Sequence, residues 1–278
     1  MTLQLGSVGS SVGPFEHTYS WSDIALYAVA LGAGPQQLDF VLEPSPKVLP
    51  TWSVIPAFQP IFAALELTGL DFAKLLHTAQ LTEQLLPFPS SGTVSTTATV
   101  VGIWDMRIGA MVQIESKSSI GSTLYARTLW SMLVSGVGEF QSGRPPASLR
   151  TRAPKDVAPN FTETWPTQQN QALLYRLTGD VNPIHARPEA AKAAGLEQPI
   201  LHGLCTYGFA ARAALHSLCA DDPSRFVSFE ARFSKQVLPG QTLIAEGYVL
   251  EPGQAALTVK IADSGELPIA NALFKYKV

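Results

Sequence analysis

The stretch Tyr175-Arg-Leu-Thr-Gly-Asp-Val-Asn-Pro-Ile-His185 ends a helix and then gathers polar side chains in a short turn. Proline cannot continue a helix and biases the residue before it towards extended geometry, so Pro183 places Asp180, Asn182 and His185 in a turn. A carboxylate and an imidazole that meet in an apolar pocket can position a water molecule and move protons. Asp and Asn before proline are also ordinary turn residues, and a lone histidine is often a surface or core residue. The spacing by itself leaves both interpretations open.

The chain around this turn resembles an earlier segment. Residues 173–179 resemble residues 25–32, and the alignment that superimposes their tyrosines shifts the sequence by 148 positions. Residues 235–242 resemble residues 84–93 at the same shift. Two copies of one structural unit explain both matches, and chance similarity of common helix and strand patterns is the alternative.

Each half places helical patterns before alternating, β-rich segments. The patterns predict helices at 24–31, 57–67, 72–76, 168–178, 189–194 and 206–218. They predict strands at 94–103, 110–116, 124–134, 226–233, 242–250, 255–262 and 269–277. Ser22 or Asp23 is the expected N-cap of the first helix, and Thr167 that of the fourth.

The last predicted helix is apolar on nearly every side, which indicates a buried helix. One buried helix followed by an antiparallel sheet predicts an α+β double hot-dog fold, in which each sheet wraps a central helix and the two sheets pair edge to edge. A segment rich in Gly, Pro, Ser and Arg divides the copies. We predict an N-terminal hot-dog domain at 1–135, a linker at 136–159 and a C-terminal hot-dog domain at 160–278.

The pattern Tyr-x-Leu-Thr-Gly-Asp-x-Asn-Pro-Ile-His resembles the signature of the hydratase 2 family, the MaoC-like (R)-specific enoyl-CoA hydratases. Pro199-Ile-Leu-His-Gly-Leu-Cys-Thr-Tyr-Gly208 is similar to the family's second block. Residues 49–56 and 69–72 resemble the N-terminal half of eukaryotic-type members, which include the hydratase part of the peroxisomal type 2 multifunctional enzyme. The resemblance implies a double hot dog with one working active site in its C-terminal half, and a homodimer.

The resemblance also implies the reaction. A hydro-lyase of this family hydrates (2E)-enoyl-CoA reversibly, by syn addition, to (3R)-3-hydroxyacyl-CoA in fatty-acid metabolism such as β-oxidation. The first copy has Gly32-Ala-Gly-Pro-Gln-Gln-Leu38 in place of the acid and histidine, so it cannot run this chemistry. In the family, the degenerate half leaves room for an acyl tail, which implies medium to long or bulky chains. Ala57, Phe58 and Phe62 are candidates to line that space or simply to pack the core.

Within this interpretation, Asp180 and His185 hold the nucleophilic water. Asp180 accepts a proton from the water and returns one to the substrate, His185 orients the water, and Asn182 holds the turn. Negative charge builds on the thioester oxygen, and the family meets it with a backbone N–H that corresponds to Gly203 here. Such a donor is worth ~3–4 kcal/mol, and a helix N-terminus adds to it.

Three further residues are candidates for substrate binding: His202, Arg232 and Lys235. The two cations lie on one predicted strand and just after it, where they would meet the phosphates of CoA. Solvent-exposed strand charges are the alternative for both. For His202, an ordinary polar residue near a helix start is the alternative.

The composition excludes several functions. Hydrophobic residues make up 46% of the chain and charged residues 15%, with a net charge of −3, which does not fit a non-specific nucleic-acid binder. We expect no nucleic-acid or membrane partner, no metal site and no cofactor beyond the CoA thioester substrate. Cys205 and Cys219 are expected to be buried and reduced. A cytoplasmic protein is expected, or a peroxisomal one in a eukaryote, although the terminal residues lack a Ser-Lys-Leu type signal.

Two alternatives to the hydratase stay open. One is a (3R)-hydroxyacyl-ACP dehydratase of fatty-acid or polyketide synthesis. The other is a non-enzymatic hot-dog module that binds acyl thioesters. The retained acid–histidine pair argues against the second, because a binding module needs no proton-transfer groups.

Overall fold

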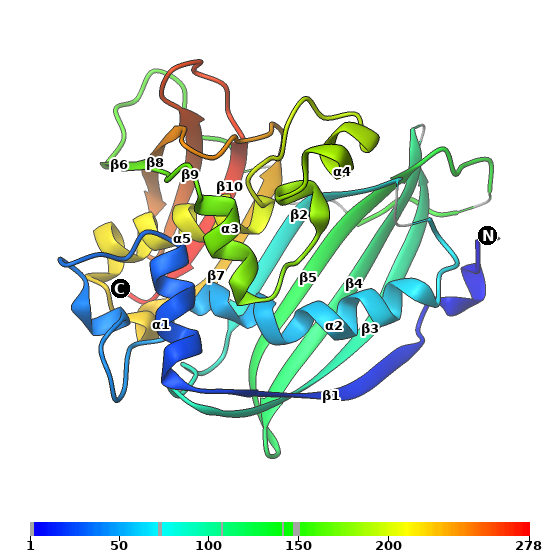
Figure 1. Ribbon diagram of the computed structural model, residues 1–278, viewed down its shortest axis with the longest axis horizontal. Coiled ribbons are helices and arrows are strands. Elements are labelled where there is room, and N and C mark those ends of the chain that lie inside the picture. The colour runs from blue at the N-terminus through cyan, green and yellow to red at the C-terminus, as the bar shows by residue number, and fades with distance from the viewer. Residues whose placement is uncertain (1–2, 72–73, 107, 141, 147–150) are drawn as a thin grey trace.

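The fold is built on one large sheet, shown in Figure 1. A computed structural model describes residues 3–71, 74–106, 108–140, 142–146 and 151–278. Its strands are β1 (Ser11–Tyr19), β2 (Leu75–Gln84), β3 (Gly92–Met106), β4 (Gly109–Ile120), β5 (Thr123–Ser135), β6 (Phe161–Pro166), β7 (Phe226–Phe233), β8 (Thr242–Glu251), β9 (Gln254–Ile261) and β10 (Ile269–Tyr276). They form one sheet in the order β1-β3-β4-β5-β2-β7-β10-β9-β8-β6, and each pair is antiparallel.

The strand order repeats the duplication of the sequence. Read from the outer edge inwards, the first half runs β1-β3-β4-β5-β2 and the second runs β6-β8-β9-β10-β7. The halves join through β2 and β7, where Ala79 pairs with Arg232 and Glu83 pairs with Ser228. Each copy thus covers an edge that the other would leave unpaired. The prediction of a double hot dog with sheets joined edge to edge is confirmed.

Five helices accompany the sheet in the described part of the chain (Figure 1): α1 (Trp21–Ala30), α2 (Val54–Glu66), α3 (Gln171–Tyr175), α4 (Pro188–Ala193) and α5 (Gly203–Cys219). Short 3-10 turns are η1 (Leu5–Ser7), η2 (Leu38–Phe40), η3 (Pro50–Ser53), η5 (Arg176–Thr178), η6 (Pro183–His185) and η7 (Pro223–Arg225). The 13-residue helix α2 packs on β1, β3 and β4, and the 17-residue helix α5 packs on β7 and β10. Each half therefore has its own central helix.

Helix α5 is buried along most of its length, as its sequence predicts, because small alanine and glycine side chains let other elements approach it. At Gly208 an added Cβ would lie 2.6 Å from a methyl carbon of Leu31, which belongs to the first half. Arg212 donates a hydrogen bond of 2.7 Å to the carbonyl of the same Leu31. The tyrosines matched by the repeat, Tyr27 and Tyr175, also meet, with ring centroids 6.1 Å apart. The halves thus share a continuous core.

Several predicted boundaries are wrong. The N-cap of α1 is Ser20, in a capping box with Asp23, rather than Ser22 or Asp23 itself. The expected helix at 168–178 is α3, with Asn170 as its N-cap, followed by η5, and Thr167 does not cap it but bonds to Gln241 and Gly240.

The helix expected at 72–76 is also wrong in its described part. Leu75 and Leu76 begin strand β2, whereas residues 72–73 lie outside the described residues. Strands β1, β2 and β6 were not predicted.

The proposed linker at 136–159 contains residues 141 and 147–150, which lie outside the described residues, and its described part carries no helix or strand. The domain boundaries at 135 and 160 stay a prediction. Among the described helices, none has both the length and the apolar character needed to cross a bilayer.

Candidate active site

The turn that follows α3 holds the acid in place through its own backbone. Gly179 has φ of +137°, a conformation that favours glycine, and it ends η5. Asp180 Oδ1 then accepts a hydrogen bond of 3.2 Å from the N–H of Asn182. The Asn182 side chain in turn accepts one of 3.3 Å from the N–H of Ile184 and so caps η6. The local sequence thus fixes one carboxylate oxygen of Asp180 and leaves the other available.

His185 is oriented by a bond from outside this turn. Its Nδ1 lies 2.8 Å from the carbonyl oxygen of Ile200, so Nδ1 carries the proton and donates. The assigned tautomer leaves Nε2 with a free lone pair. Asp180 and His185 are both buried, at 8% and 7% exposure, so bulk solvent has little access to either side chain.

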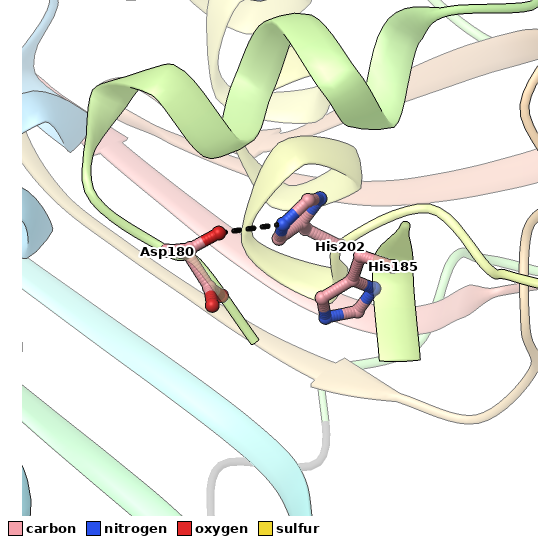
Figure 2. Close-up of side chains that lie close together, drawn as sticks. All are labelled: Asp180, His185 and His202. Atoms are coloured by element: carbon pink, nitrogen blue, oxygen red, sulfur yellow. Dashed lines mark hydrogen bonds between the residues drawn. The ribbon is translucent and has the colours of Figure 1, made fainter. Parts of the chain in front are cut away.

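His202 lies beside both residues, as Figure 2 shows. Its Nε2 donates to the backbone carbonyl of Asp180 at 3.1 Å. Its ring stacks on the His185 ring, with centroids 3.7 Å apart and an interplanar angle of 27°. Ligand atoms of Asp180, His185 and His202 lie within 4.8 Å of one another, and these residue types also bind metals. The lone pairs of two stacked rings lie in neighbouring planes, so this arrangement does not favour both rings binding one ion.

Burial sets the electrostatics of the pair. It raises the pKa of the Asp180 carboxyl, against the opposing effects of His185 and the Asn182 N–H. Burial lowers the pKa of His185, against the opposing effect of Asp180. Burial disfavours the charged form of each group, while each group stabilises the charge of the other, which is typical of groups that exchange protons with a ligand.

The pair faces a cavity of about 310 Å³. The second half contributes Asp180, His185 and Gly203 to its wall. The N–H of Gly203 lies at the start of α5 and has no hydrogen-bond partner among the described residues. A free N–H at a helix start, beside an acid and an imidazole, can receive an oxygen atom that gains negative charge.

The first half supplies aromatic walls to the same cavity, which sequence reasoning located only in part. Phe58 and Phe62 line it, as proposed, whereas Ala57 is buried in the core. His77 and Trp130 also line it, stacked with centroids 4.9 Å apart. Burial lowers the pKa of His77 to about 4, so this ring is neutral. No local signal marks these two residues, because pairing between β2 and β5 brings them together.

Of the three residues expected to bind substrate, only Lys235 lines the cavity. Lys235 also pairs with Glu266 at 2.9 Å. His202 is fully buried behind the cavity wall. Arg232 is not among the lining residues, because strand alternation places its side chain on the face opposite that of Phe233, which does line the cavity.

The fold and this turn together define a double hot-dog protein of the MaoC-like class. Residues 150–262 match the MaoC like domain, and residues 17–136 match the MFE-2 hydratase 2 N-terminal domain. The chain is similar to a probable enoyl-CoA hydratase 2 of Dictyostelium discoideum, at 37% identity over 91% of this chain and 89% of that protein. It is also similar to the peroxisomal multifunctional enzyme type 2 of Mus musculus, at 37% identity over 96% of this chain but only 38% of that longer protein.

Solved structures agree. A crystal structure of a MaoC-like dehydratase from Phytophthora capsici superimposes with a TM-score of 0.90 and 27% identity, covering 99% of this chain and 98% of that one. The chain belongs to the enoyl-CoA hydratase 2 family of MaoC-like proteins.

Proposed function

We propose that this protein is a hydro-lyase that reversibly hydrates (2E)-enoyl-CoA to (3R)-3-hydroxyacyl-CoA. The observation that carries the proposal is that the Asp180 carboxylate and the unprotonated Nε2 of His185 line the same cavity. The names of relatives that match most of the chain, among them the Dictyostelium hydratase, support it. The reaction needs no cofactor besides the CoA thioester.

In the proposed mechanism, a water molecule sits between the free carboxylate oxygen of Asp180 and Nε2 of His185. Its oxygen attacks C3 of the enoyl group while Asp180 takes one of its protons. The electron pair of the C2–C3 double bond moves towards the thioester oxygen, where the Gly203 N–H donates to the growing charge. Asp180 then delivers a proton to C2 on the same face, which gives syn addition and restores the carboxylate.

We propose that Asn182 contributes by holding the turn rather than by moving protons. Its side-chain oxygen is already occupied by the N–H of Ile184, and its own N–H fixes Asp180. The backbone of this turn therefore sets the direction from which the acid meets the water.

The degenerate first half is proposed to hold the acyl chain. Phe58, Phe62 and Trp130 form an apolar part of the cavity wall. A second hollow of about 490 Å³ adjoins the cavity through Lys235 and Gln236, and we expect parts of CoA there. With the acyl chain in the cavity and parts of CoA in the second hollow, we propose medium to long or bulky acyl chains as substrates. Arg232 lines neither space, so it would contact CoA only from outside the cavity.

The test is hydration of crotonyl-CoA, followed as loss of enoyl-thioester absorbance, with chiral analysis of the product. The proposal expects turnover and a (3R) product. No turnover across a series of chain lengths, or a (3S) product, would contradict it. A longer series also gives the chain-length preference.

A dehydratase acting on a carrier protein is the second candidate. Similarity to 3-hydroxyacyl-thioester dehydratase Y of Mycobacterium tuberculosis, at 36% identity over 95% of this chain and 93% of that protein, supports the dehydration direction on a thioester whose carrier that name does not specify. The same pair of groups would run the reaction backwards, since every step is reversible. Comparing kcat/KM for one acyl chain on CoA and on a carrier protein decides between them.

A homodimer in the cytoplasm, or in the peroxisome of a eukaryote, completes the proposal. Light scattering coupled to size-exclusion chromatography measures the first, and a fluorescent fusion in the source cell reports the second.

A further inference from the structure

His202 touches three parts of the proposed machinery that lie on different segments. It bonds through Nε2 to the carbonyl of Asp180, in the turn after η5, at 3.1 Å. It stacks on His185, in η6, at 3.7 Å. It is the N-cap of α5 and directly precedes Gly203. Figure 2 shows its ring between the Asp180 backbone and the His185 ring.

We propose that His202 is a positioning residue, which fixes the acid and the imidazole relative to the Gly203 N–H without exchanging protons with the substrate. The inference rests on the proposed hydration and deepens it. The side chain is fully buried and does not line the cavity, so it does not reach the reacting atoms.

The stacking of His202 on His185 restrains the His185 ring in a way that its hydrogen bond to Ile200 does not. The bond from Nδ1 to the Ile200 carbonyl fixes one point of the ring but leaves the ring free to pivot about that bond. The ring stacked against its face restricts this rotation and so sets the direction of the Nε2 lone pair. A misplacement of about 1 Å in such a group can cost about 100-fold in rate.

Fold stability alone does not account for a histidine at this position. Its Nδ1 is buried and has no partner among the described residues, which opposes folding. An apolar ring would pack there without that penalty but would lose the bond to Asp180. The histidine therefore serves the placement of both groups at some expense to stability.

The neutral state of His202 suits this role. Burial, and next the nearby His185, lower the pKa of His202 to about 3. Asp180, His185, Tyr175 and Arg176 are the ionisable groups that face it, and its bond to the Asp180 carbonyl only partly offsets the burial. A neutral ring against His185 does not compete for a proton, and its face stabilises positive charge that develops on His185.

Two substitutions separate the two contacts. His202→Phe keeps a ring against His185 and loses the donor to Asp180, whereas His202→Gln keeps a donor and loses the ring. Each is expected to lower kcat for crotonyl-CoA by at least about tenfold with KM changed less than about threefold. His216→Gln, an exposed histidine on the same helix, is the matched control and leaves both constants unchanged.

The inference is overturned if both variants fold and hold kcat within about threefold of the unsubstituted protein. Absence of hydratase activity in the unsubstituted protein would instead refute the proposed function. If the variants do not fold, nitrogen-15 NMR of labelled histidines in the unsubstituted protein still decides. The inference expects His202 as a neutral Nε2–H tautomer from about pH 5 to pH 9, and titration of His202 in that range would overturn it.

Discussion

Replacing Asp180 with asparagine removes the proposed proton acceptor while keeping its shape. The asparagine oxygen can still accept the bond from the Asn182 N–H, so the turn is expected to survive. The other carboxylate oxygen becomes an amide NH2 group, which cannot take a proton from water. Loss of general-base catalysis corresponds to about 10²–10⁴ in rate, or about 3–5 kcal/mol of barrier. We expect kcat for crotonyl-CoA to fall by at least about 100-fold.

The thermal stability of the Asp180→Asn protein is not expected to fall with its activity. Burial raises the pKa of Asp180, so keeping this carboxylate ionised costs the folded protein some free energy. A neutral amide relieves that penalty, and the melting temperature should stay level or rise. Asp263→Asn, an exposed acid in a turn, is the matched control for both measurements. A folded Asp180→Asn protein with kcat within tenfold of the parent would refute the reasoning.

Three further predictions concern stability and specificity. The unfolded chain takes up protons near pH 6.5 at His202 and His77, whereas the folded chain does not until about pH 3 and about pH 4. The contribution of these two histidines to the free energy of unfolding is therefore present above pH 6.5 and is lost as the pH falls, by about 3 kcal/mol between pH 6.5 and 5 for the two residues together; urea unfolding at several pH values measures this, and a flat profile would contradict it. Phe62→Ala opens the wall between the cavity and an adjoining hollow of about 280 Å³, and should raise kcat/KM for long enoyl-CoA relative to crotonyl-CoA by about tenfold; an unchanged ratio would count against the placement of the acyl chain. Gly208→Val drives a side chain against Leu31 and should lower the free energy of unfolding by about 1–3 kcal/mol, which an unchanged urea midpoint would disprove.

The sequence predicted the parts of the fold that local patterns determine. Helix α5 and strand β7 were found because their residues are apolar in a continuous or alternating pattern. Strand β2 was missed because its inward-facing row is polar: Gln80 and Thr82 are fully buried in the middle of the sheet. A buried polar row reverses the usual hydrophobic alternation, so only the pairing with β5 and β7 identifies it.

The site divides in the same way. The turn with Asp180 and His185 is local, and its glycine and proline boundaries are readable in the sequence. The stacked His202 and the cavity wall at Trp130 depend on contacts between distant segments, which spacing does not reveal. The orientation of Arg232 could have been predicted from the sequence. Side chains alternate along a strand, and its apolar neighbours Ala231 and Phe233 face inward, so Arg232 points outward.

A double-variant cycle tests the central claim most directly. Asp180→Asn, His185→Gln and the combined variant are compared for kcat/KM on crotonyl-CoA. If the two side chains hold one water molecule, losing either disables the site, and the combined variant should be no more than about threefold slower than the slower single variant. Losses that multiply, or a single variant that keeps full activity, would contradict a shared water.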